Sequence, residues 1–138
     1  MLSDCSFVFN STESSNGSFT SPNWPGLYPR ETECNYFFYG QDNERVHITF
    51  KYFDIDGVPP CDRDTLSDFL EFSNFPTVDR KMPRYCGSNR PTTIESDVGF
   101  FRVTFRSNEK FDATGFDAFY HFVSPKGNSF LFVTLSFI

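Results

Sequence analysis

The sequence lacks the features that would place it in several common classes of protein. Its 138 residues contain no run of about 18 apolar residues, so no transmembrane helix is predicted. Residues 1–5 have neither the basic nor the apolar region of a signal peptide, so we expect the chain to be a fragment or an unusual isoform if it is secreted. No segment keeps helical periodicity over several turns, which disfavours an all-α fold.

Positive charge is scarce. The chain has 12 Lys and Arg residues against 18 Asp and Glu residues, giving a net charge of -6 and a pI of about 4.8. Because binding to nucleic acid or to an anionic membrane needs a basic face, the composition argues against both partners. An acidic surface instead favours cations, either a metal ion or the Lys and Arg side chains of a protein partner.

Local catalytic motifs are missing as well. The sequence has no GxSxG, no HExxH, no phosphate-binding loop and no D-S/T-G pair. His47 and His121 fall on outward-facing positions of predicted strands, where a solvated side chain is the simpler interpretation. We therefore predict that the chain is not an enzyme.

The four cysteines, Cys5, Cys34, Cys61 and Cys86, are evenly spread and form no CxxC pair. Zinc sites usually take two ligands from one tight turn, so this spacing argues against zinc. An even number of cysteines in a small domain rich in phenylalanine predicts two disulfides. Three connectivities are open, and four reduced core thiols are the alternative.

Two glycosylation sequons lie close together near the N-terminus. Asn10 begins the sequence N-S-T, and Asn16 begins N-G-S. Both fall in a polar stretch that is expected to be a loop. Together with the cysteines, they predict N-glycosylation at Asn10 and Asn16 and a location that is secreted or in the extracellular part of a membrane protein.

Short segments with period-two alternation or a high content of β-forming residues recur along the chain, separated by turn residues. These segments are residues 35–39, 45–51, 69–72, 101–106 and 116–123. The 20 Phe residues are suited to fill a layer between two sheets. The pattern therefore predicts an all-β fold, in which two antiparallel sheets pack as a β-sandwich.

Six segments carry a recognisable pattern: SPNWPGLYP at 21–29, RVHITFKYFD at 45–54, CDRDTL at 61–66, YCG at 85–87, TFRSN at 104–108 and GF at 115–116. In order and spacing they resemble the CUB domain, a module of extracellular proteins. That family has S-P-N-aromatic-P-x-x-Y-P in the first segment, R-I/V-x-I/L-x-F-x-x-F-D in the second and C-x-x-D-x-L/V in the third. The resemblance holds from Cys5 to about Val123.

The resemblance implies a jellyroll-like sandwich over residues 5–123, with Cys5 paired to Cys34 and Cys61 to Cys86. Residues 1–4 are then an N-terminal extension. Residues 124–138 form an apolar tail that breaks the pattern, is too short to span a bilayer and is expected to lie outside the fold. The family further implies a non-catalytic recognition module within a larger multidomain protein.

Aspartates crowd the turn around Cys61. Taken without the family, they are either solvated turn formers or oxygen ligands that converge on a hard cation. The resemblance implies a calcium site with Asp56 and Asp64 as ligands, Asn108 in the third position and Tyr28 in support. Calcium-binding members have Asp where this chain has Asn108, so we expect weak calcium binding, and a metal-free acidic loop is the alternative.

Two modes of recognition follow from these features. We expect the acidic rim to bind a Lys or Arg side chain of a protein partner. The alternative is a glycan or heparin-type sulfate, bound by one basic strip across neighbouring strands. The residues expected to form that strip are Arg45, Lys51, Arg102 and Arg106.

Overall fold

The computed structural model describes residues 2–76 and 83–124. Within these residues the chain forms nine strands and one short 3-10 helix. In chain order they are β1 (Ser3–Asn10), β2 (Asn16–Thr20), β3 (Thr32–Tyr39), β4 (Arg45–Asp54), η1 (Arg63–Thr65), β5 (Phe69–Ser73), β6 (Arg84–Tyr85), β7 (Ile94–Glu95), β8 (Phe100–Arg106) and β9 (Gly115–Val123).

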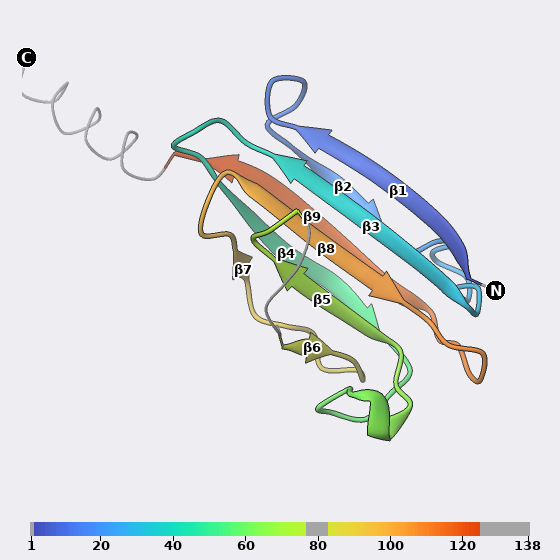
Figure 1. Ribbon diagram of the computed structural model, residues 1–138. Helices are drawn as coiled ribbons and strands as arrows, with labels where there is room; N and C mark the ends of the chain where they lie inside the picture. Colours follow the sequence, from blue (N-terminus) through green and yellow to red (C-terminus); the bar gives the residue numbers. More distant parts are fainter. Residues whose placement is uncertain (1, 77–82, 125–138) are drawn as a thin grey trace, which may run out of the picture.

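The strands form two sheets that pack face to face (Figure 1). Among the described residues, one sheet has the order β1-β3-β8-β5-β6 and the other has the order β2-β9-β4-β7. The predicted all-β sandwich with two disulfides is confirmed. The alternation in the sequence has the expected cause: Val46, Ile48 and Phe50 of β4 are buried between the sheets.

One strand pair departs from the predicted antiparallel arrangement. β1 runs parallel to β3, with Cys5 opposite Cys34 in the register. Parallel neighbours need a connection that crosses over, and here the connection passes through β2 in the other sheet. The segment that contains Asn16 was expected to be a loop, and that expectation was wrong because this segment forms β2.

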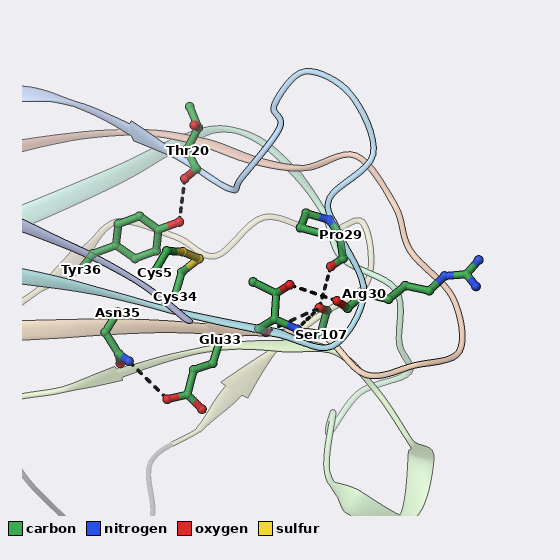
Figure 2. Close-up of a disulfide and its surroundings, with 10 residues drawn as sticks. Cys5, Thr20, Pro29, Arg30, Glu33, Cys34, Asn35, Tyr36 and Ser107 are labelled. Carbon is green, nitrogen blue, oxygen red and sulfur yellow. Dashed lines mark hydrogen bonds between the residues drawn. A yellow bond between two sulfur atoms is a disulfide. The ribbon is translucent and has the colours of Figure 1, made fainter. Parts of the chain in front are cut away.

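The two disulfides join Cys5 to Cys34 and Cys61 to Cys86, which is the pairing that the family resemblance implies. The first crosslinks neighbouring strands, and Figure 2 shows its surroundings. Beside it, the buried Tyr36 of β3 donates a hydrogen bond of 2.7 Å to the carbonyl of Thr20 on β2. This bond connects the two sheets within the aromatic layer, where Phe19 and Phe116 also contact the Tyr36 ring.

The structure describes residues on both sides of the predicted boundaries at Cys5 and Val123. Ser3 and Asp4 belong to β1 and pair with β3, so the predicted boundary at Cys5 falls inside a strand. Residues 125–138 of the predicted tail lie outside the described residues. Within the described part of the chain, no helix is long and apolar enough to cross a membrane.

Candidate functional site at the acidic end

Three loops meet at the end of the sandwich where the N-terminus lies (Figure 1). They are residues 21–31 before β3, 55–68 after β4, and 107–114 between β8 and β9. The antiparallel pairing of β3 with β8 and of β4 with β9 brings these strand ends together. Residues far apart in the sequence therefore become neighbours at this end.

Asp68 lies at the centre of this end, at the start of β5, and is fully buried. Its two carboxylate oxygens accept different hydrogen bonds. The Tyr28 hydroxyl donates to Oδ2 at 2.6 Å, and the Asn108 backbone amide donates to Oδ1 at 2.7 Å. The Asp68 amide itself donates to the carbonyl of Asp56 at 2.9 Å. We call Tyr28, Asp56, Asp68 and Asn108 the acidic network.

Tyr28 joins the loops through its hydroxyl group. The ring is buried against Phe105, with the centroids 4.8 Å apart, and the Tyr28 amide donates to the carbonyl of Ala113. The hydroxyl accepts a hydrogen bond from the Asp56 amide at 2.9 Å and donates to Asp68. Burial and the bond to Asp68 raise the pKa of Tyr28, so it stays a neutral donor.

The surroundings of Asp68 disfavour the ionised form of its carboxyl group. Burial raises the pKa of Asp68 to about 6, the hydrogen bonds from Tyr28 and Asn108 oppose this shift, and the carboxylates of Asp56 and Asp112 add to it. At neutral pH the group is therefore a buried anion with acidic neighbours. Positive charge at this end would reduce the repulsion among these carboxylates.

The structure brings three of the four predicted calcium-site residues together and leaves the fourth apart. Tyr28, Asp56 and Asn108 belong to the acidic network, whereas Asp64 is an exposed residue of η1. In the described part of the chain, no hydrogen bond joins the Asp64 side chain to the network. Among the described residues of this loop, Asp68 is the one whose carboxylate bonds to both Tyr28 and Asn108.

The sequence contains the signal for Asp68, because the pattern D-x-L occurs twice. Asp64 precedes Leu66, which is 55% exposed, and Asp68 precedes Leu70, which is fully buried in β5. Counting residues from Cys61 selected Asp64. The period-two pattern of β5, in which the chain returns to the sandwich, selects Asp68.

Asn108 differs from a carboxylate in its contacts. Its Oδ1 accepts from the Lys110 amide at 2.9 Å, and its Nδ2 donates to the carbonyl of Leu66 at 2.6 Å. Leu66 adopts a left-handed φ of 54°, which is uncommon for this residue type and turns its carbonyl toward Asn108. Across residues 2–76 and 83–124, no three His, Cys, Asp or Glu side chains are placed to hold one metal ion.

The basic strip expected from the sequence does not form. Arg45 and Lys51 lie on β4, and Arg102 and Arg106 lie on β8 in the other sheet. The outer faces of these two sheets point in opposite directions. Period-two alternation identified outward positions correctly but gave no information about which sheet each strand joins, so this expectation was wrong.

The predicted glycosylation residues lie at the other end of the sandwich (Figure 1). Asn10 is the last residue of β1, and Asn16 is the first residue of β2. Asn16 is exposed, and Oδ1 of Asn10 accepts hydrogen bonds from both the amide and the hydroxyl of Thr12. The acidic end and the sequon end are thus separated by the length of the strands.

The family model of the CUB domain matches residues 5–120. The chain belongs to the CUB domain family. Human Tolloid-like protein 2 is 34% identical over 112 residues, which cover 80% of this chain and 10% of that protein. This CUB domain therefore spans about a tenth of the length of that relative.

Solved structures of CUB domains have the same fold. The CUB1-EGF-CUB2 domain of human MASP-1/3 matches with a TM-score of 0.69 and 26% identity, over 84% of this chain and 41% of that one. The MASP-1 CUB2 domain bound to Ca2+ matches with a TM-score of 0.68 and 24% identity, over 83% and 96% of the two chains. At that identity the second likeness shows the fold.

Tyr28→Phe tests the acidic network. Removing the hydroxyl leaves Asp68 Oδ2 and the Asp56 amide without their shared partner, so we expect a loss of about 1–3 kcal/mol in the free energy of unfolding. Tyr52→Phe is the matched control, because that hydroxyl contacts Thr114 at the surface; its effect should stay within about 0.5 kcal/mol. Equal effects in chemical denaturation with disulfides intact would contradict the central role of Tyr28.

Proposed function

We propose that the acidic end of this CUB domain binds a basic side chain of a protein partner and that calcium supports this binding. This chain is a CUB domain. CUB domains act as protein–protein interaction modules in multidomain extracellular proteins, generally without catalytic activity. The partner's chemistry, the calcium dependence and the residues of the site are the proposal.

The observation that carries the proposal is the buried carboxylate of Asp68. Its two oxygens are held by donors from two other loops, and Asp56 and Asp112 add negative charge around it. Loops fixed in this way present their carboxylates in a defined arrangement. A basic side chain that reaches such a site forms a charge-assisted contact, which is worth about 1.5–3 kcal/mol when desolvated.

The donor set fits a weakly bound calcium ion. Asp56 and Asp68 supply carboxylate oxygens and Asn108 supplies an amide oxygen, which are hard ligands of the type that calcium takes. We propose Asp68 in the position that the sequence assigned to Asp64. Two carboxylates, rather than three, predict weak affinity. The solved MASP-1 CUB2 domain bound to Ca2+ makes calcium the first ion to test in this family.

Each residue of the acidic network has a separate task in this proposal. Tyr28 donates to Asp68 and accepts from the Asp56 amide, so it orients both acidic residues. The Asn108 amide holds the second oxygen of Asp68. Calcium supplies charge neutralisation when bound, and the partner's cation then approaches loops that are already ordered.

We further propose that Asn10 and Asn16 carry N-glycans. Asn16 is exposed and Asn10 is half-buried, and both lie at strand ends next to the connection between β1 and β2, which supports accessible sequons. Glycans there lie at the end of the sandwich remote from the acidic network. They therefore leave the proposed binding end uncovered.

Calorimetry of chelator-treated protein tests the metal site. We expect calcium to bind with a dissociation constant of about 10⁻⁴–10⁻³ M and to raise the melting temperature. Asp68→Asn should abolish both effects, whereas Asp64→Asn, which removes the same charge from η1, should bind calcium as the wild type does. Loss of binding in Asp64→Asn alone would return the ligand role to Asp64. Absence of heat in the wild type would exclude calcium.

Recognition of a basic side chain is tested by an amide NMR titration with N-acetyl-lysine methylamide. In the presence of calcium, the Asn108 amide should shift, because it bonds to Asp68 within the acidic network and so reports a cation that docks on these loops. N-acetyl-norleucine methylamide, which lacks the charge, is the control ligand. No lysine-specific shift at the acidic network would refute the proposed partner chemistry even if calcium binds.

Glycosylation is tested by peptide mapping of the protein secreted from animal cells. Asn10→Gln and Asn16→Gln should each remove one glycan from the intact mass. Unmodified asparagine at both positions in the secreted protein would contradict this assignment.

A further inference from the structure

A β-bulge in β4 creates an unusual surface on the outer face of the four-stranded sheet. The register of β4 against β9 shifts between Phe50 and Tyr52. As a result, the consecutive residues Lys51 and Tyr52 are both exposed, between the buried Phe50 and Phe53. Bulges often redirect side chains at functional positions, so the neighbours of this one are informative.

Arg90 is held at the bulge by the backbone. Its Nη1 donates to the carbonyls of Phe50 and Lys51, each at 3.2 Å. These carbonyls lie past the end of the short β7, whose pairing with β4 stops at Ile48. The Arg90 guanidinium is therefore attached to the bulge through one of its nitrogens. In the described part of the chain, its other N–H groups make no hydrogen bond.

The two cations at the bulge lack acidic partners. Arg30, Arg84 and Arg106 each form an ion pair with a nearby carboxylate. Neither Lys51 nor Arg90 does so among residues 2–76 and 83–124; the Lys51 ammonium lies only over the Phe119 ring, at 5.8 Å. In a chain of net charge -6, these two unpaired cations are a local concentration of positive charge.

An open pocket of about 370 Å³ lies at this position, lined by Lys51, Tyr52, Phe53, Asp54, Ser88 and Arg90. The Tyr52 ring, which is 41% exposed, forms an aromatic surface with Trp24, whose centroid is 4.7 Å away. Asp54 and Ser88 add hydroxyl-binding groups on the same lining. The pocket thus combines cations, an aromatic surface and hydrogen-bonding side chains.

We propose that this pocket binds a sulfated sugar unit of an acidic glycan. The sulfate pairs with Lys51 and Arg90, the sugar ring packs on Tyr52, and sugar hydroxyls donate to Asp54. An acidic peptide suits the pocket less well. Its side-chain carboxylates have no hydroxyl group that can donate a hydrogen bond to Asp54, whereas a sugar has several. The site is separate from the acidic network and does not depend on calcium.

The test is calorimetry or surface plasmon resonance with a heparin hexasaccharide, using the full chain in chelator at low salt. Lys51→Gln and Arg90→Gln should each weaken binding about tenfold, consistent with the loss of one charge-assisted contact. Arg106→Gln is the matched control, because it removes the same charge from the opposite sheet. Melting curves verify folding, and Lys51→Gln keeps the test decisive if the Arg90 variant unfolds.

Two further probes separate the ligand classes. The desulfated hexasaccharide should bind much more weakly than the sulfated one, and a hexaglutamate peptide should not compete. Equal weakening by Lys51→Gln and Arg106→Gln would show diffuse electrostatic attraction and overturn the pocket. Stronger binding of hexaglutamate would overturn the sugar assignment in favour of an acidic peptide.

Discussion

A buried carboxylate holds the acidic end of this domain together. Asp68 is anchored by a hydroxyl from one loop and an amide from another, and its own amide binds the carbonyl of Asp56 at the start of the loop to which both belong. Removing one partner from a buried charge is costly, so the three loops are energetically coupled. The geometry of the end therefore depends on contacts among loops that are distant in the sequence.

The aromatic layer makes this arrangement possible. Phe116 is fully buried and contacts rings from both sheets, including Tyr36 of β3 and Phe50 of β4. Tyr28 extends the same layer to the acidic end through its contact with Phe105. The Tyr28 ring thus packs in the core while its hydroxyl lies in the acidic network, so one side chain contributes both to the packing of the sandwich and to the geometry of the candidate site.

The sequence predicted the elements whose pattern is local. Alternation located β8 and β9 closely and found β4 up to Lys51, three residues short of its end at Asp54, because each of these strands buries one face. It missed β1, β2, β6 and β7, all of which lie at sheet edges. Non-local features were harder to predict. The sequence did not show that Lys51 and Arg106 belong to different sheets, nor that Asp68 contacts both Tyr28 and Asn108. Family motifs supplied the disulfide pairing, which spacing alone left open.

The two proposed surfaces illustrate how one scaffold separates opposite charges. The acidic network lies within the loop end, where Asp68 is buried beside Asp56 and Asp112, whereas Lys51 and Arg90 lie on the outer face of the four-stranded sheet and form no ion pair among the described residues. Asp68 is held in place by hydrogen bonds and Arg90 by the backbone carbonyls at the bulge, so neither group is free to move toward the other. A chain with a negative net charge can therefore present a cation-binding end and a local anion-binding pocket, since each is set by its immediate surroundings rather than by the overall charge.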